Sequence, residues 1–292
     1  MKIAVVFSPM RRGFSFTYQL NQLVTGLEEE GVKAKVFDTF TSAVRRYDIL
    51  LWWTPFRTPE FEDVSIFKKR YTKVQVFYNP VDTNSLSNFV KERVKAFADV
   101  IITASTHNKK LYEKTGIPTY VVPHSISPED LPEDCELDDD LYFVENKTFP
   151  IRRGADIAVS YPLKFLSPPG CVASHDFYLK HMCKAGNIIM PARGGEFEIE
   201  VLEALAMGMK VYVSRREIFD YVEDMYKVFP INGEYCNTEY GNDIYQQGCY
   251  DNVVRVDKLP EVPSPNPKHY VDKYNYREKA KVFLKVLENA GL

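Results

Sequence analysis

The chain has 292 residues, of which 45% are hydrophobic, and a formal net charge of −3. This length is at or past the size at which one hydrophobic core stops growing, so we expect two domains. Eight acidic residues and no basic residue lie between positions 129 and 140, which leaves the remainder slightly basic. Such a balance argues against a nucleic-acid-binding protein, which needs a basic stripe, and allows a local basic pocket for a phosphorylated ligand.

No apolar run approaches the roughly 20 residues that cross a bilayer, and the N-terminus lacks the long apolar region of a signal peptide. The five cysteines are an odd number without a CxxC pair, which fits free thiols in a reducing compartment. We therefore expect a cytoplasmic protein without a transmembrane segment, for which peripheral membrane contact stays open.

The first half of the chain alternates predicted strands with predicted helices. Apolar runs predict strands at residues 2–7, 33–37, 48–53, 74–78, 100–103 and 120–122. Helical spacing of Leu20, Leu23, Val24 and Leu27, and a second stretch at 88–97, predict helices between some of these strands. This alternation is typical of a doubly wound parallel sheet.

A second alternation follows an acidic stretch, PEDLPEDCELDDD, at residues 128–140. Its two prolines and self-repelling charge predict a linker between domains. Beyond it we expect strands at 141–144, 172–173, 187–190 and 210–214, then a loop-rich region, a proline-rich connector at 260–267 and a helix at 276–287. The predicted domains are 1–127 and 141–265, with a terminal helical segment at 266–292, and two such domains imply a cleft between them.

The stretch ARGGEFEIEVLEALAMG at 192–208 gathers four glutamates at the start of a predicted helix. Spacings of four and seven residues place Glu196, Glu200 and Glu203 on one face, whereas Glu198 points elsewhere. Acidic residues at a helix N-terminus complement the helix dipole without any ligand, which is the simpler interpretation.

Gly194 and Gly195 in the preceding turn suggest a ligand as well. We expect them to expose free backbone N–H groups at a strand-to-helix turn, which would suit an anion such as a pyrophosphate. The carboxylates would repel that anion, so we expect them to contact hydroxyl groups while basic residues contact phosphates. A nucleotide sugar offers both features.

The segment 178–214 resembles the signature of retaining GT-B glycosyltransferases, most closely glycosyltransferase family four. The matching residues are Pro191, Phe197, Leu202, Glu203, Ala204, Ala206 and Gly208. The resemblance implies two Rossmann-like domains facing a cleft, with the nucleotide sugar on the second domain and the acceptor on the first. It also implies that the terminal helix crosses back to the first domain.

In that family two glutamates with seven residues between them contact the donor sugar and the ribose. Here the ribose contact falls on Glu203, and Glu196 takes the place of the first glutamate, whose own position is Gly195. The resemblance implies that residues 194–198, namely Gly194, Gly195, Glu196, Phe197 and Glu198, surround the donor.

The segment Arg153-Gly154-Ala155-Asp156 resembles a Lys-Gly-x-Asp segment of the family, in which the lysine binds the donor pyrophosphate, and Arg153 takes the place of that lysine. A guanidinium is well shaped for bidentate phosphate contact. The family's companion arginine has no clear counterpart, because Val144, Glu145 and Asn146 stand in its place, and Arg152 is the candidate substitute.

The first domain carries three further candidates from the same resemblance. The loop after the first strand contains Arg11, Arg12 and Gly13, and we expect it to face the cleft together with His124 at the interdomain junction. Asn79 stands where the family tends to carry a histidine near the sugar, and an amide can also hydrogen-bond a sugar hydroxyl.

The resemblance implies a retaining, metal-independent hexosyltransferase that needs no cofactor beyond a nucleotide-diphosphate sugar. Arg153, Arg152 and the N–H groups from Gly195 to Phe197 would stabilise the departing diphosphate, with Glu196 and Asn79 near the reacting sugar. The hydroxyl acceptor, a glycan, a lipid or a protein, stays open. Two other functions also stay open: a non-catalytic nucleotide-sugar or glycan binding protein, and a nucleotide-sugar epimerase.

The spacing of Cys171, His175, His181 and Cys183 follows no common zinc-site pattern, so we expect no metal.

Overall fold

The computed structural model describes residues 1–7, 14–38, 41–53, 72–79, 88–146, 152–169, 174–195, 197–236 and 249–291. Among the predicted site residues, Arg11, Arg12, Gly13 and Glu196 lie outside these ranges, as does the strand predicted at 172–173. The chain divides into two compact units, one formed by Met1–Ser125 and Tyr276–Leu292 and the other by Ile126–Asn275.

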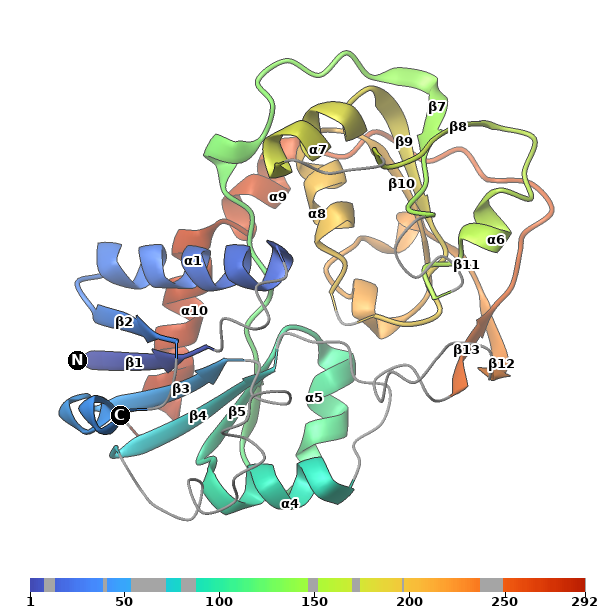
Figure 1. Ribbon diagram of the computed structural model, residues 1–292. Helices are drawn as coiled ribbons and strands as arrows, with labels where there is room; N and C mark the ends of the chain where they lie inside the picture. Colours follow the sequence, from blue (N-terminus) through green and yellow to red (C-terminus); the bar gives the residue numbers. More distant parts are fainter. Residues whose placement is uncertain are drawn as a thin grey trace. The chain divides into compact units, whose positions relative to one another are not determined.

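The first unit is built on a six-stranded parallel sheet with the strand order β2-β1-β3-β4-β5-β6 (Figure 1). Its strands are β1 (Lys2–Val6), β2 (Lys33–Phe37), β3 (Ile49–Trp53), β4 (Val74–Asn79), β5 (Val100–Thr103) and β6 (Thr119–Val121). Its helices are α1 (Phe14–Glu29), η2 (Ser42–Arg46), α4 (Asn88–Phe97), α5 (Thr106–Glu113) and α10 (Tyr276–Asn289).

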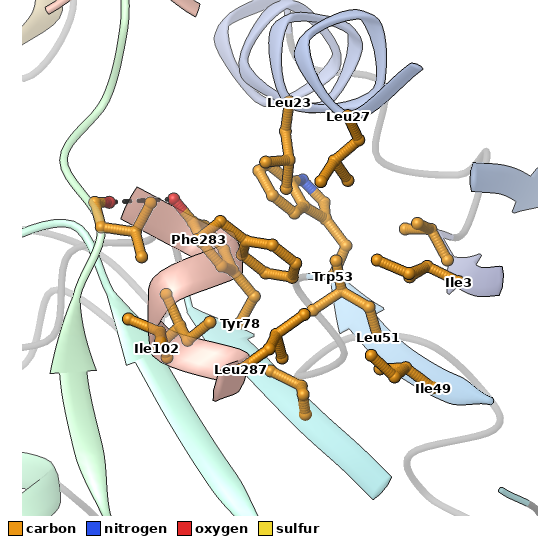
Figure 2. Close-up of a cluster of buried hydrophobic side chains, with 14 of the residues drawn as sticks. Ile3, Leu23, Leu27, Ile49, Leu51, Trp53, Tyr78, Ile102, Phe283 and Leu287 are labelled. Atoms are coloured by element: carbon orange, nitrogen blue, oxygen red, sulfur yellow. Dashed lines mark hydrogen bonds between the residues drawn. The ribbon is translucent and has the colours of Figure 1, made fainter. Parts of the chain in front are cut away.

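Alternate residues of the central strands supply two cores, one on each face of this sheet. Trp53 and Tyr78 belong to the core that also contains residues of α1 and α10, and their rings stack at a centroid distance of 4.3 Å (Figure 2). Trp52 and Phe77 face the opposite way, into the core formed with α4 and α5. Both faces are apolar because a parallel sheet is covered on both sides, which explains the continuous apolar runs in the sequence.

The C-terminal helix α10 completes the first of these cores. Phe283 and Leu287 of α10 are fully buried against the sheet, and α10 packs against α1. Gly26 of α1 permits this packing, since a methyl group there would lie 2.5 Å from the carbonyl oxygen of Tyr276.

A buried lysine ties α10 to α1. The Lys279 amine donates to Oε1 of Gln19 at 2.8 Å and to the Gln19 carbonyl at 3.1 Å. Gln19 in turn holds the backbone of Ser125 through its side-chain amide, with bonds of 2.7 and 2.9 Å. Burial lowers the pKa of Lys279 well below its ordinary value, because desolvation disfavours the charged ammonium.

The second unit contains a five-stranded parallel sheet with the order β11-β10-β9-β7-β8 and a separate antiparallel pair, β12 and β13. Its strands are β7 (Asp138–Phe143), β8 (Lys164–Leu166), β9 (Ala185–Met190), β10 (Lys210–Ser214), β11 (Lys227–Phe229), β12 (Ile231–Cys236) and β13 (Cys249–Val253). Its helices are η4 (Pro128–Asp130), α6 (Ala155–Ala158), α7 (His175–Met182), α8 (Ile199–Ala206), η5 (Glu217–Phe219), η6 (Asp224–Tyr226) and α9 (Pro267–Lys273).

The acidic stretch at residues 128–140, predicted to be a linker, contains regular secondary structure at both ends. It begins with the short helix η4 and ends inside β7, whose first residues pair with β9 while their carboxylates stay exposed. Strand pairing uses the backbone, so three successive aspartates at a strand end are tolerated when their side chains remain in water. Lys210 also pairs with Asp139 at 3.2 Å.

The C-terminal part also differs from the sequence expectation. The region predicted to be loop-rich contains β11, β12 and β13, which are short and flanked by polar residues. The segment 266–292 forms two helices: α9 packs on α8 in the second unit, and only α10 belongs to the first unit. Within the described ranges, no helix is both long enough and apolar enough to span a membrane.

Replacing Lys279 with Met tests the buried amine. The unfolded chain binds a proton at Lys279 up to the ordinary pKa of 10.5, whereas the folded chain releases it at lower pH. The free energy of unfolding of the wild type should therefore rise with pH inside this window, by about 1.4 kcal/mol per unit of pKa depression.

Urea unfolding at pH 7 and pH 9.5 measures this effect. Lys279→Met should lack the gain, and the control Lys285→Met, at an exposed position of the same helix, should keep it. Equal pH dependence in wild type and Lys279→Met would contradict a depressed pKa.

Candidate functional site

The topology of the second unit points to one end of its sheet. β7 and β9 are neighbours, while the strands that follow each of them, β8 and β10, lie on opposite sides. In open parallel sheets the segments after two such strands diverge, and ligands bind at the carboxyl ends there. The segment after β7 leads to Glu145 and Arg153, and the segment after β9 leads to the turn 191–198 and α8.

The loop that carries Arg152 and Arg153 is bonded to the turn after β9. The carbonyl of Arg152 accepts the N–H of Arg193 at 2.7 Å and the N–H of Gly194 at 3.3 Å. Gly194 is buried, and its N–H is already used within the protein. The prediction of a free N–H for an anion at Gly194 is therefore wrong, because this N–H donates to the neighbouring loop at Arg152.

Gly154 makes this approach possible. Its φ of +75° lies in the left-handed region, and a Cβ at this position would collide with the carbonyl oxygen of Pro191. Only glycine meets both conditions without strain. The glycine and the proline recognised in the sequence thus lie against each other.

Aromatic packing supports the end of the turn. Phe197 is buried and stacks on Tyr221 with a centroid distance of 4.0 Å and an interplanar angle of 16°. The Tyr221 hydroxyl donates to the carbonyl of Glu198 at 2.7 Å. Gly195, with a φ of +150°, lies against the Glu198 carboxylate, where a Cβ would collide. These contacts hold Glu198 at the N-terminus of α8.

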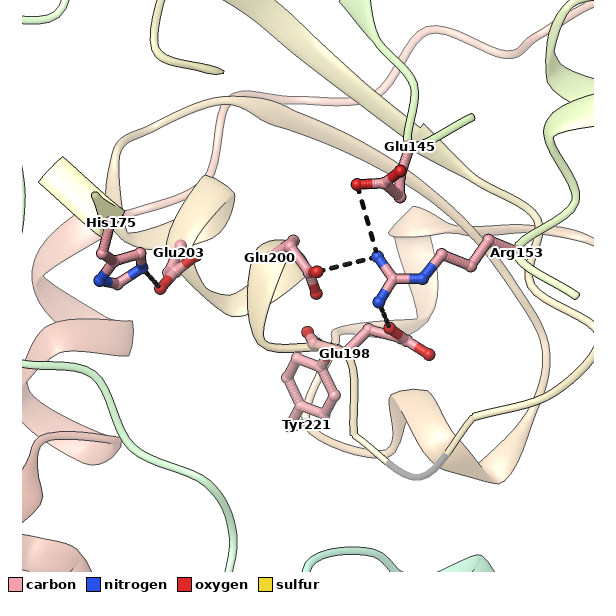
Figure 3. Close-up of polar contacts among 7 residues, drawn as sticks. All are labelled: Glu145, Arg153, His175, Glu198, Glu200, Glu203 and Tyr221. Carbon is pink, nitrogen blue, oxygen red and sulfur yellow. Dashed lines mark hydrogen bonds and ion pairs between the residues drawn. The ribbon is translucent and has the colours of Figure 1, made fainter. Parts of the chain in front are cut away.

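Three carboxylates surround the guanidinium of Arg153 (Figure 3). Glu200 lies 2.8 Å from it, Glu198 3.2 Å and Glu145 4.0 Å, and all four side chains are largely buried. The expectation that Glu198 points away from Glu200 is wrong. Glu198 precedes the helix and has extended backbone angles, so helical spacing does not apply to it.

The charges of this cluster do not balance. Burial opposes the charged form of Arg153, but the carboxylates outweigh it and raise its pKa well above the ordinary value. Burial likewise opposes ionisation of Glu200, yet the charge and hydrogen bond of Arg153 lower the pKa of that carboxyl. The guanidinium of Arg153 therefore faces three acidic groups, while the charge of Arg152 also acts on Glu200, and an anion that binds Arg153 competes with these carboxyl groups.

Glu203 faces a different partner. Its Oε1 lies 2.6 Å from Nε2 of His175 in α7, and its side chain is only 2% exposed. Figure 3 shows this pair on one side of Glu200 and Arg153 on the other. Glu200 and Glu203, predicted to share a helix face, thus bind different groups.

Burial and the contact between the two side chains both affect the protonation of this pair. Desolvation disfavours a charged imidazole, but the hydrogen bond and charge of Glu203 outweigh it, so the pKa of His175 is raised. Burial also raises the pKa of Glu203, against the lowering effect of His175. Both directions mean that the pair retains a proton to higher pH than separate groups would. His175 entered the sequence analysis only as a metal candidate, because its contact with Glu203 spans 28 residues.

Three further polar residues have defined places in the structure. Arg193, which sequence analysis did not single out, forms a bidentate pair with Asp156 at 2.6 and 2.8 Å. Asn79 ends β4 and is fully buried opposite Thr103, and His124 is buried beyond β6. Both belong to the first unit. Considering described residues alone, no three His, Cys, Asp or Glu side chains are grouped as metal ligands.

Gly154→Ala tests the contact between the two loops. We expect the Ala variant to lower the free energy of unfolding by about 1–3 kcal/mol more than a glycine replacement that introduces no collision. Gly233→Ala is the matched control, since Gly233 has a φ of +74° and no atom within 4 Å of an added Cβ. Calorimetric unfolding of both variants measures the difference, and equal losses would show that the Pro191 contact contributes nothing.

Comparison with known proteins places this geometry in context. No protein-family model matches the chain. It is 25% identical to "Putative glycosyltransferase 45" of Sulfolobus islandicus filamentous virus, in an alignment that covers 98% of this chain and 94% of the viral protein.

Solved structures resemble the chain in fold at low sequence identity. The complex of Anabaena HepE with UDP matches with a TM-score of 0.54 and 13% identity, over 77% of this chain and 84% of HepE. Sucrose-phosphate synthase from Thermosynechococcus elongatus matches with 0.56 and 11%, over 76% and 83%. The lipopolysaccharide outer core galactosyltransferase WaaB matches with 0.52 and 11%, over 99% of both chains. With two parallel-sheet α/β units that match these structures, the chain has the GT-B fold, as the sequence predicts.

Proposed function

We propose that this protein is a glycosyltransferase that moves a sugar from a nucleotide-diphosphate sugar to a hydroxyl acceptor. The observation that carries the proposal is the buried Glu203 on α8, on the strand-turn-helix segment that follows β9 at the carboxyl end of the second sheet. A buried carboxylate there is suited to accept hydrogen bonds from vicinal hydroxyls of a ribose.

Sequence and fold similarity support the same class. The viral relative, which aligns along nearly its whole length, carries a glycosyltransferase name. HepE has been crystallised with UDP, with UDP-glucose, and with UDP and glucose, and WaaB is named a galactosyltransferase. We therefore propose a uridine nucleotide as the first donor to test and a hexose as the transferred sugar.

The proposed chemistry is metal-independent and retains configuration at the anomeric carbon. Glu203 binds the ribose, and Gly195, Phe197 and Glu198 lie around the donor sugar. Asn79 of the first unit acts near the reacting sugar, and His124 lies on the acceptor side. Arg153, with Arg152, stabilises the departing diphosphate. Because three carboxyl groups lie within 4.0 Å of the Arg153 guanidinium, a bound diphosphate competes with them for this side chain.

The acidic surroundings of Arg153 favour a second candidate, a nucleotide-sugar binding protein without transferase activity. Carboxylates beside the leaving group would oppose the charge that develops when the glycosidic bond breaks. The scaffold could then still bind the nucleoside through Glu203 while the chemical step is lost.

A panel of nucleotide sugars distinguishes the two candidates. We expect release of nucleoside diphosphate in the presence of hydroxyl acceptors, undiminished by EDTA, and loss of at least about 1.4 kcal/mol of binding, tenfold in Kd, in Glu203→Gln. NMR of the product reports the anomeric configuration. Binding without release for any acceptor favours the binding protein, and the absence of binding contradicts both.

Glu145→Gln tests whether Arg153 contacts the diphosphate. Glutamine keeps the shape of Glu145 but removes one of the charges that compete for Arg153, so UDP should bind more tightly, on the order of tenfold. Isothermal titration measures the effect, with Asp224→Asn as control because that side chain is 98% exposed. Unchanged affinity in Glu145→Gln would assign Arg153 to the structural support of α8 alone.

A further inference from the structure

Two helices of the second unit meet at Glu203. The helix α7 begins after Ser174, whose Oγ accepts the N–H of Phe177 at 3.2 Å and so defines the first helical turn. That turn carries His175, and its imidazole reaches Glu203 of α8 at 2.6 Å. The side chains are 13% and 2% exposed, so the contact is shielded from water.

We infer that His175 is a positioning residue for Glu203: its Nε2 holds Oε1 so that the second carboxylate oxygen accepts a hydroxyl of the donor ribose. The inference rests on the proposed function and adds a residue to it. A glutamate has three side-chain torsions, and a hydrogen bond to one oxygen limits where the other can lie.

The surroundings of Glu203 disfavour its ionised form. Two further carboxylates, Asp130 of η4 and Glu200 of α8, act on both members of the pair and disfavour another negative charge. Burial adds to this effect on Glu203. The hydrogen bond and the charge of His175 oppose these influences and act to lower the pKa of Glu203.

A second buried polar group lies on the same helix. Tyr178 lies one helical turn beyond His175, and its hydroxyl is buried without a hydrogen-bond partner among the described residues. The charges of Glu200 and Glu203 act on this hydroxyl, and together with burial they raise its pKa well above the ordinary value. Buried hydroxyls are rarely left unpaired, so a ligand hydroxyl beside Glu203 would satisfy it.

Ribose discrimination tests the inference. The affinities of UDP, 2′-deoxy-UDP and 3′-deoxy-UDP are measured by isothermal titration for wild type, His175→Ala and His175→Gln. We expect the wild type to prefer UDP over at least one deoxy form by about tenfold. His175→Ala should bind UDP about tenfold more weakly and lose most of this preference. His175→Gln, whose amide can donate in place of Nε2, should recover both.

The control and the outcomes separate this inference from the proposed function. Lys180→Ala, at an exposed position of α7, should behave as wild type. Wild-type preference in His175→Ala would overturn the inference while leaving the proposed function intact. A wild type that binds UDP but does not distinguish the deoxy forms would also overturn it. If no nucleoside diphosphate binds the wild type, the proposed function fails and the inference fails with it. Thermal unfolding of each variant verifies that it is folded.

Discussion

The ion pairs of Arg153 with Glu145, Glu198 and Glu200 connect the parts of the second unit on which the candidate site depends. They join the segment after β7, the loop before α6 and the first residues of α8. Burial makes each of these charges costly alone, so the four side chains stabilise one another's position. The same arrangement limits function, because the guanidinium expected to bind phosphate is already surrounded by negative charge.

Backbone contacts make the ion pairs possible. Gly154 lets its loop lie against Pro191, the Arg152 carbonyl accepts from the turn after β9, and Tyr221 braces that turn through Phe197 and the Glu198 carbonyl. The cluster is therefore the result of close packing between two loops at the carboxyl ends of neighbouring strands. Glu203 lies one turn further along α8 and depends on α7, which separates the proposed ribose contact from the proposed phosphate contact.

Much of the fold could be predicted from local patterns. A strand buried on both faces, such as β1, β3 or β9, gives a continuous apolar run. A helix buried on one face, such as α1 or α10, gives apolar residues at the helical period. Short strands with polar residues, such as β8 and β12, carry no such period. The polar aspartates at the start of β7 predict a linker, although strand pairing depends on the backbone.

The sequence by itself determined that the chain forms two α/β parts and that Arg153, Gly154, Pro191 and Glu203 belong to a glycosyltransferase-like pattern, since these features depend on residues near one another in the chain. Only the tertiary structure decided which charges meet. Glu200 reaches Arg153 across 47 residues of the chain and His175 reaches Glu203 across 28, and the Gly194 N–H donates to the carbonyl of Arg152. Spacing within one segment does not report on contacts between segments, because those depend on how the strands are ordered and how closely their loops pack.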